Sequence, residues 1–381
     1  MIYLDNNASA PLRPAAKAAV ANAYESFGNA SSVHQAGRAA RARIEQARGA
    51  VAHLAACEPS EVVFTSGGSE ANALALRGAI AGAAETGSRI ARLMISAIEH
   101  DSVRANASIV AENTPGLKLQ EIPVFANGTL QLSGLREMLM HGKGRVLVSV
   151  MAANNETGVL QDVPQIAKIL KQEGGTEALL HVDAIQAAGR TSWSFSEVDY
   201  VSLSAHKMGG PQGVGALIVR NPAPLSAQIA GGQEMGRRAG SENVAAICGF
   251  GAAAEERTPE SESASLRDRF EAALKSLVPD VVIFGESAKR LGNTSNFAIP
   301  GLSSETALIA LDLDGIAVSS GAACSSGKVR PSHVLAAMAV PESLARCAIR
   351  ISFGWTNQQR DVDAVLDSLQ RLLARRAALA A

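Results

Sequence analysis

The sequence predicts an α/β fold in which a mainly parallel sheet, with helices on both faces, is followed by a smaller α+β region. Up to about residue 255, short β-branched runs alternate with longer, alanine-rich stretches. Such alternation is typical of parallel strands joined by crossover helices. Beyond that point comes the charged, Ser- and Pro-containing stretch Glu255–Ala264, followed by shorter strand-like runs. We therefore expect a large domain at 14–254 and a small domain made of 1–13 and 255–381.

The elements of the large domain follow from short apolar runs and from alanine-rich stretches. The expected strands are Val62–Thr65, Leu93–Ser96, Val146–Val150, Leu179–Asp183, Tyr200–Ser204 and Gly215–Val219. The expected helices include Ser69–Ala84, Asp101–Glu112 and Pro164–Glu173. In the small domain the pattern predicts a helix at Leu266–Leu277, a helical tail, and strands at Val281–Phe284, Asn296–Ile299, Ile316–Ser319 and Ala348–Ser352.

Composition restricts the class of protein. The chain has 381 residues, of which 47% are hydrophobic and 19% charged, as in an ordinary globular protein. Its 35 basic and 36 acidic residues leave no basic field for nucleic acid. It lacks a signal-peptide pattern, an apolar run long enough for a membrane helix, and the cysteine spacing of a disulfide framework or zinc site. We expect a cytoplasmic protein in a thiol-reducing setting.

The segment Tyr200–Gly215 contains the clearest sign of a cofactor. An apolar run leads directly into Ser204, His206 and Lys207, and a glycine-rich turn follows. A lysine at the end of a buried strand is costly unless it is neutralised or bonded. A covalent bond to an aldehyde cofactor does both. A lone Lys-Met-Gly-Gly is more typical of a surface loop, so this interpretation depends on the neighbouring segments.

Two of those segments suit pyridoxal 5′-phosphate (PLP). The run ending at Asp183 offers a carboxylate for the pyridine nitrogen, and Gln186 offers a donor for the phenolic oxygen. Alone, Asp183 is more typical of a helix N-cap. The turn Gly67–Gly68–Ser69, between a strand and a helix, predicts a phosphate site, although an ordinary capped helix is the alternative there.

Further polar residues follow other strands at the same expected edge of the sheet. His100 ends the run from Met94, where it is placed to lie on the pyridine ring and carry protons. A histidine hydrogen-bonded in a loop is the alternative. The motif Asn154–Gly158 follows the strand at Val146. Together these strand ends predict a PLP site with Lys207 as its lysine.

The sequence resembles the class V aminotransferase family and, within it, the cysteine desulfurases of the nitrogen-fixation type. The similarity covers nearly the whole chain, with motifs in the same order. They are Tyr3-Leu-Asp-Asn-Asn-Ala, Phe27-Gly-Asn-Ala-Ser-Ser-Val-His34, Thr65-Ser-Gly-Gly-Ser-Glu70, Glu99-His100, Ala153-Asn-Asn-Glu-Thr-Gly158, Asp183-Ala-Ile-Gln186, Ser204-Ala-His-Lys207, Gly231-Gly-Gln-Glu, Arg237-Arg-Ala-Gly-Ser-Glu-Asn243 and Ser319-Ser-Gly-Ala-Ala-Cys-Ser-Ser-Gly327.

The resemblance implies PLP fold type I, a homodimer, and transfer of sulfur from L-cysteine, through an enzyme persulfide, to an acceptor such as an iron–sulfur cluster scaffold. The cofactor-binding residues that it implies are Gly68, Ser69, His100, Asn155, Asp183, Gln186, Ser204, His206 and Lys207, with Ser241 reaching the phosphate in the other subunit. Serine replaces the family's usual threonine at 241 and keeps the hydroxyl. The Asn7-Ala-Ser-Ala and Asn29-Ala segments also depart from the family pattern, at the substrate side.

Cys324 is the predicted sulfur-accepting nucleophile. It lies between Gly321 and Gly327 in a Gly- and Ser-rich segment, whose composition predicts a mobile surface loop. Its thiolate would attack the sulfur of bound cysteine. Cys324 is also the one residue for which we predict a metal contact, and only while sulfur passes to an iron–sulfur acceptor. An incidental loop thiol is the alternative if the PLP site is ignored; the other cysteines, Cys57, Cys248 and Cys347, are expected to be core or boundary residues.

Arg350 alternates with apolar neighbours in Ala348–Ser352, so it needs an anionic partner. The carboxylate of an amino-acid substrate suits its fork, and an internal salt bridge is the alternative. The resemblance assigns Arg350 to the substrate carboxylate, with Asn155 and Asn29 beside it. It also assigns His100 and Lys207 as proton carriers.

Other functions remain open from the sequence. A selenocysteine lyase or a plain aminotransferase would keep the cofactor but change the chemistry. A non-catalytic PLP-binding scaffold is a further alternative. The sulfur acceptor and the pathway that it supplies are not specified by these motifs.

Overall fold

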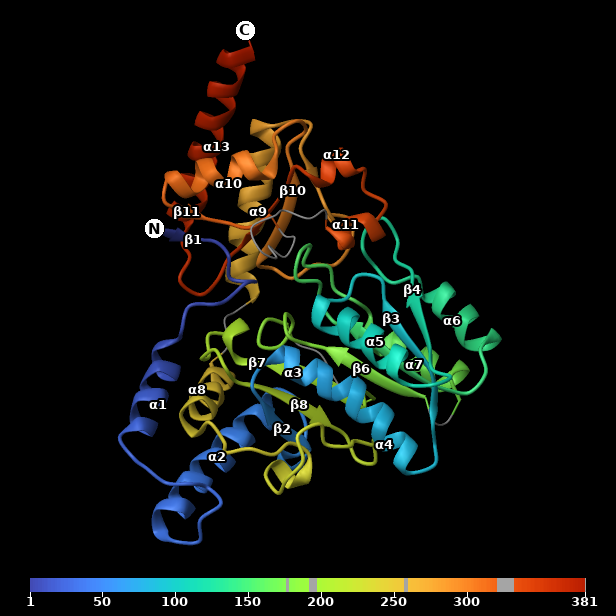
Figure 1. The fold of residues 1–381 in the computed structure, drawn as a ribbon. Coiled ribbons are helices and arrows are strands. Elements are labelled where there is room, and N and C mark those ends of the chain that lie inside the picture. The colour runs from blue at the N-terminus through green and yellow to red at the C-terminus, as the bar shows by residue number, and fades with distance from the viewer. Residues whose placement is uncertain (176–177, 192–196, 257–259, 321–331, 381) are drawn as a thin grey trace.

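The computed structural model describes the chain except residues 176–177, 192–196, 257–259, 321–331 and 381 (Figure 1). Its strands are β1 Ile2–Tyr3, β2 Val62–Thr65, β3 Ile90–Ser96, β4 Lys118–Ile122, β5 Arg145–Met151, β6 Leu179–Asp183, β7 Tyr200–Ser204, β8 Gly215–Val219, β9 Val282–Ile283, β10 Thr294–Ala298, β11 Ile316–Ala317 and β12 Ala348–Ser352. Its helices are α1 Pro14–Tyr24, α2 Gln35–Leu54, α3 Gly68–Ala73, α4 Ala79–Glu85, α5 Asp101–Asn113, α6 Leu132–His141, α7 Val163–Glu173, α8 Val244–Glu255, α9 Glu260–Leu277, α10 Ser304–Leu313, α11 His333–Ala337, α12 Glu342–Ala345 and α13 Gln359–Ala380.

A seven-stranded sheet in the order β2-β8-β7-β6-β5-β3-β4 lies at the centre of the region that precedes α9. The strands from β7 to β4 pair in parallel, whereas β8 runs antiparallel to both β7 and β2. The chain between β7 and β8 is short, which leaves no room for the crossover that a parallel pair needs. The predicted α/β fold with a mainly parallel sheet is confirmed.

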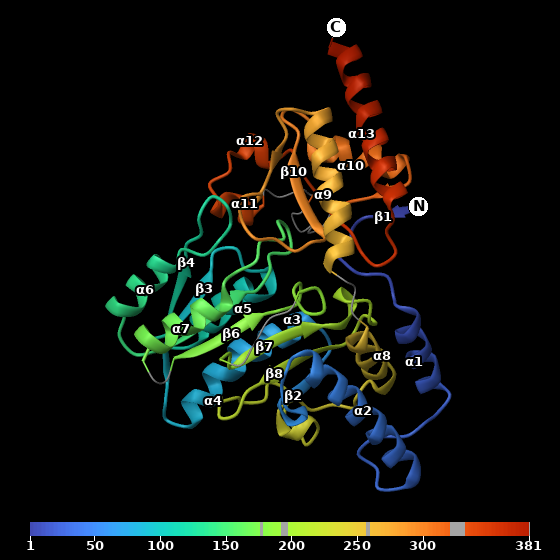
Figure 2. The same ribbon diagram turned by 180° about the vertical axis from the view of Figure 1, so that it is seen from behind.

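Helices cover both faces of this sheet (Figures 1 and 2). One apolar cluster packs α3, α4 and α5 against one face through residues such as Ala71, Ile80 and Val103. Another packs α2, α6, α7 and α8 against the opposite face through residues such as Ile44 and Ile166. Because β5, β6 and β7 are thus buried on both sides, nearly all their residues are buried and most are apolar. The buried polar residues Ser149, His181 and Ser202 satisfy one another by hydrogen bonds.

The sequence predicted most central strands well. The bounds of β2, β6, β7 and β8 are those expected. The expected helix Ser69–Ala84 is helical throughout but is divided into α3 and α4 by a π-helical turn at 74–78. The edge strand β4 was not expected, since the sequence Lys-Leu-Gln-Glu-Ile is largely polar and exposed. In the C-terminal region, β9 and β11 are shorter than expected, and β10 begins earlier.

The C-terminal region has its own small sheets. Strands β12, β10 and β9 form an antiparallel sheet, and β1 pairs in parallel with β11. An apolar cluster joins Leu4 to Phe270, Phe297, Ile349 and Leu369. The first residues of the chain therefore pack with part of the C-terminal region. The division into domains of 14–254 and of 1–13 plus 255–381 stays a prediction. Helix α13 projects beyond this region (Figure 2).

Within the described part of the chain, none of the helices combines the length and the apolar character that crossing a lipid bilayer requires.

Candidate active site

A cavity of about 810 Å³ lies at the carboxyl ends of the central strands and extends to the C-terminal region. Its volume is within the range of small-molecule and cofactor sites. The predicted site residues that line it are Gly68, Ser69, His100, Asn155, Asp183, Gln186, Ser204, His206, Lys207 and Arg350. Asn29 and Ser241 are exposed and are not among its lining residues. Cys324 lies outside the described residues.

Lys207 enters the cavity from a 3₁₀ turn that follows β7 directly. Its Nζ donates to the carbonyl oxygens of Asn7 and Ala8, at 2.8 and 2.9 Å. Burial lowers the pKa of Lys207 to about 8, and the positive charges of Arg190 and Arg350 act in the same direction. The neutral amine, which is the nucleophilic form, is therefore far more available near neutral pH than in a free lysine.

Asp183 ends β6 as a buried carboxylate held by donors on both oxygens. Oδ1 accepts from the backbone N–H of Ile185 at 3.0 Å, and Oδ2 accepts from the side-chain amide of Asn72 at 2.8 Å. Burial raises the pKa of Asp183, while these hydrogen bonds and the nearby His100 and Lys207 oppose the rise. A cation placed against the carboxylate would favour its ionised form. A protonated ring nitrogen is such a cation, so the residue fits the predicted role.

The other end of the cavity fits a phosphate. A Cβ atom at Gly68 would lie 2.3 Å from the Cδ1 of Ile185 and 3.2 Å from the Cβ of Ser204, so a larger residue there would have to displace the Ile185 side chain. The buried Oγ of Ser204 has no hydrogen-bond partner among the described residues. Burial lowers the pKa of His206 to about 4, helped by the charge of Lys207. Neutral donors and an unpartnered hydroxyl thus surround the space beside α3.

His100 is the N-cap residue of α5, and its side chain lines the cavity. Its Nδ1 accepts from the backbone N–H of Ser102 at 3.1 Å and lies 2.9 Å from the Ser102 hydroxyl. With Nδ1 as acceptor, the imidazole proton is on Nε2. The hydrogen-bonded histidine that was the alternative is thus present. Because the side chain also lines the cavity, its role against a ring stays a prediction.

Arg350 reaches the cavity from β12, on the side opposite the sheet. Its Nη2 pairs with Oδ1 of Asp5 at 2.6 Å, and its Nη1 donates to the carbonyl of Asn155 at 2.9 Å. Its buried Nε has no hydrogen-bond partner in the described part of the structure. The internal salt bridge that the sequence offered as an alternative is thus present, and these two contacts use two of the five N–H donors of the guanidinium.

Several residues of the site were not predicted. Asn72, which donates to Asp183, lies in the expected helix Ser69–Ala84, and Asp5, which pairs with Arg350, lies in the motif that begins at Tyr3. Spacing did not reveal what either residue contacts. Glu156 is buried beside the cavity and accepts from the hydroxyl of Ser332 at 2.5 Å. Burial raises the pKa of Glu156 to about 7. Arg190, which lies behind Gln186, could not be assigned to the site from the sequence, because its positive charge was its only distinguishing feature.

Comparison with known proteins shows which family this chain resembles in sequence and in fold. The family model described as aminotransferase class-V matches residues 2–365. The chain is 40% identical to a protein named cysteine desulfurase from Gluconacetobacter diazotrophicus, over 98% of this chain and 94% of that protein. It is 37% identical to an IscS-like cysteine desulfurase of Mycobacterium tuberculosis, over 100% of this chain and 99% of the relative. The solved structure of a NifS-like protein from Rickettsia africae superposes with a TM-score of 0.87 at 35% identity, covering 98% of this chain and 99% of the other.

Proposed function

The chain belongs to the class-V aminotransferase family, and from that membership we propose that it is a cysteine desulfurase. It converts L-cysteine to L-alanine and transfers the sulfur to its own cysteine thiol. The observation that carries the proposal is one cavity that joins Lys207, Asp183 and a phosphate-sized cradle on the sheet side to Arg350 on the other. An amino acid bound by its carboxylate at Arg350 would therefore face the lysine.

PLP is the proposed cofactor. Lys207 would hold it covalently, Asp183 and Gln186 would hold its ring, and His100 would lie against the ring. Its phosphate would be held by Gly68, Ser69, Ser204 and His206, with Asn155 beside the ring and the substrate. When bound, PLP supplies an electron sink that makes the Cα proton of an amino acid acidic and weakens a bond at Cβ.

The protein groups perform the remaining steps. Arg350 binds the substrate carboxylate, and Lys207 and His100 move the Cα proton. The Cys324 thiolate attacks the substrate Sγ, so an S–S bond forms while the Cβ–Sγ bond breaks. Protonation of Cβ then leaves alanine, and Cys324 keeps the sulfur as a persulfide. Because the thiol belongs to the same chain, sulfur transfer needs no second collision.

The other cysteines are poorly suited to this role. Cys347 is buried, and Cys57 and Cys248 are partly buried. Burial raises the pKa of Cys57 to about 12 and also raises that of Cys248. Their thiols remain protonated near neutral pH, and a protonated thiol is a weak nucleophile. Because these three cysteines are poorly suited to accept sulfur, Cys324 is the favoured acceptor.

The Cys324→Ala variant tests the function directly. We expect it to bind PLP with the wild-type absorbance band but to lose sulfide release from L-cysteine in the presence of a reducing thiol by about 100-fold or more. Alanine and sulfide are measured together, with Cys248→Ala as the matched control. Full activity in Cys324→Ala would reject the nucleophile. Retained alanine formation from selenocysteine alone would identify a selenocysteine lyase.

Arg350 is expected to determine substrate affinity. Replacing it by glutamine should raise KM for L-cysteine by roughly 10- to 100-fold, the loss expected for a charge-assisted hydrogen bond to a carboxylate. Arg346→Gln removes an exposed arginine that pairs with Glu342 and is the control. Steady-state kinetics on both variants decide the point, and an unchanged KM in Arg350→Gln would show that the carboxylate binds elsewhere.

We also propose a homodimer that supplies an iron–sulfur scaffold or another sulfur acceptor in the cytoplasm. The exposed Phe27 and Val33, at 89% and 86% exposure, are apolar side chains suited to burial in an interface. Ser241 is exposed, as a residue serving the other subunit would be in an isolated chain. A persulfide-forming thiol requires reducing conditions, which favours the cytoplasm.

A further inference from the structure

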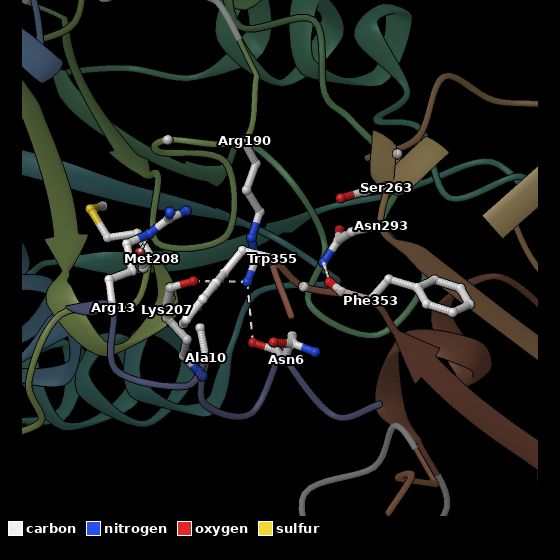
Figure 3. Close-up of a pocket in the computed structure, with 13 residues that line it drawn as sticks. Asn6, Ala10, Arg13, Arg190, Lys207, Met208, Ser263, Asn293, Phe353 and Trp355 are labelled. Carbon is white, nitrogen blue, oxygen red and sulfur yellow. Dashed lines mark hydrogen bonds between the residues drawn. The ribbon is translucent and has the colours of Figure 1, made fainter. Parts of the chain in front are cut away.

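Arg190 lies behind the active site, in the turns that follow β6. Its guanidinium joins two segments that are far apart in the sequence (Figure 3). Nη2 donates to the carbonyl of Asn6 at 3.2 Å and to the carbonyl of Lys207 at 2.9 Å. Nη1 donates to the side-chain oxygens of Asn7, at 2.9 Å, and of Gln186, at 2.5 Å. Each of these acceptors is a neutral oxygen.

A partly buried guanidinium with neutral partners is costly, because neutral oxygens offset less of its desolvation than a carboxylate would. Burial lowers the pKa of Arg190 to about 10, and the charge of Arg350 acts in the same direction. The side chain nevertheless remains a cation near neutral pH. Ion pairing therefore does not explain why a charged arginine lies at this position, and the contacts of Arg190 indicate another role.

The contact with Gln186 fixes the orientation of an amide. A guanidinium has only donors, so the amide oxygen of Gln186 must face Arg190. The NH₂ group of Gln186 is then the end left for other partners, and it donates to the carbonyl of Asn7 at 2.9 Å. Gln186 is buried and lines the cavity. It consequently offers a donor to a bound ligand, rather than an acceptor.

The same guanidinium also donates hydrogen bonds to the Asn6–Asn7 segment, which Lys207 contacts through its Nζ. The carbonyl of Asn7 accepts from Lys207 Nζ at 2.8 Å as well as from Gln186. Arg190 holds that segment through Asn6 and Asn7 and holds Lys207 through its backbone. One side chain thus sets the relative positions of the amine and of the amide that face the cavity.

We propose that Arg190 is a positioning residue: its guanidinium holds the Gln186 amide with its NH₂ toward the cofactor and fixes the Asn6–Asn7 segment against Lys207. The inference rests on the proposed function, since a donor from Gln186 matters only to a ligand with an acceptor oxygen at that place. In PLP that acceptor is the phenolic oxygen, whose ionisation determines the absorbance of the bound cofactor.

The test compares Arg190→Gln, Gln186→Ala and the double variant, each purified and reconstituted with PLP. A cavity of about 40 Å³ borders Arg190, Lys207 and Trp355, so a shorter side chain and a water can be accommodated there (Figure 3). We expect Arg190→Gln to shift the absorbance maximum in the same direction as Gln186→Ala and to lower kcat/KM by roughly 10- to 100-fold. The double variant should lose less activity than the sum of the two single losses, because part of the effect of the first change passes through Gln186.

Arg92→Gln is the matched control. Arg92 is also a buried arginine that donates to carbonyl oxygens, those of Met138 and Gly144, but it lies near the start of β3, away from the cavity. Its loss should lower the melting temperature without moving the absorbance maximum. If Arg190→Gln is not recovered folded, Arg190→Lys serves instead, because it keeps the charge but loses the two-pronged donor geometry.

The outcomes separate the two proposals. An unshifted spectrum and unchanged kinetics in Arg190→Gln would overturn the positioning role, as would fully additive effects in the double variant. If the wild type itself binds no PLP or forms no alanine from cysteine, the proposed function fails instead. A shift shared by Arg190→Gln and Gln186→Ala and absent from Arg92→Gln supports the inference.

Discussion

Lys207→Ala should lower alanine formation from L-cysteine by at least about 1000-fold, because it removes the proposed point of covalent attachment of the cofactor and a proposed proton carrier. The amine is poised for this chemistry by its place at the end of β7, where burial lowers its pKa to about 8. Its present partners are two carbonyl oxygens, which release it without leaving a buried charge unpaired. The fold should persist, since these contacts are few.

Two measurements check this result. Borohydride treatment of the PLP-reconstituted wild type, followed by peptide mass spectrometry, should find the cofactor on the peptide that contains Lys207. Lys171→Ala, which removes an exposed lysine on α7 paired with Glu197, should retain full activity. Cofactor bound covalently to a different lysine, or substantial activity in Lys207→Ala, would contradict the assignment.

Asp183→Asn should reduce kcat by about 100-fold or more while PLP still binds, since an amide has the shape of the carboxylate but cannot stabilise a protonated ring nitrogen. The oxygen of the new amide would still accept from the backbone N–H of Ile185. Its NH₂ would face Asn72, whose side-chain amide would have to turn so that its oxygen, which has no partner among the described residues, accepts from it. The variant therefore isolates the charge from the packing.

The control for this change is Asp199→Asn. Asp199 precedes β7 at the opposite end of the strand, and its Oδ2 accepts from the backbone N–H of Leu180 at 2.8 Å. Burial raises the pKa of Asp199 as well, so both substitutions replace a shielded carboxylate. Near-normal kcat in Asp183→Asn, or an equal loss in Asp199→Asn, would show that the ring is not held by Asp183.

The central strands were predictable because burial on both faces gives short, largely apolar runs, and β6 and β7 end in the polar residues Asp183 and Ser204. Asp183 and Lys207 could be placed at one edge of the sheet by that rule alone. The C-terminal strands β9 and β11 are only two residues long, and so short a run gives little periodicity. The fold class was therefore easier to predict than the bounds of these small strands.

The partners of the site residues were less predictable, because they depend on contacts between distant segments. The carboxylate that meets Arg350 is Asp5, and the guanidinium that orients Gln186 is Arg190. Asn29 and Ser241 do not line the cavity of the single chain, so their predicted roles remain proposals. The prediction for Cys324 also rests on sequence, since that residue lies outside the described part of the chain.

The ion pair between Asp5 and Arg350 connects positions 345 residues apart. During synthesis Lys207 leaves the ribosome well before Arg350 does, so the lysine exists for a time without the arginine opposite it. A chain ending before β12 would contain the proposed cofactor lysine but not the arginine proposed to bind the substrate carboxylate. If these proposals hold, the ability to bind an amino acid is completed late in synthesis, because this wall of the cavity combines Asp5, near the start of the chain, with Arg350, near its end.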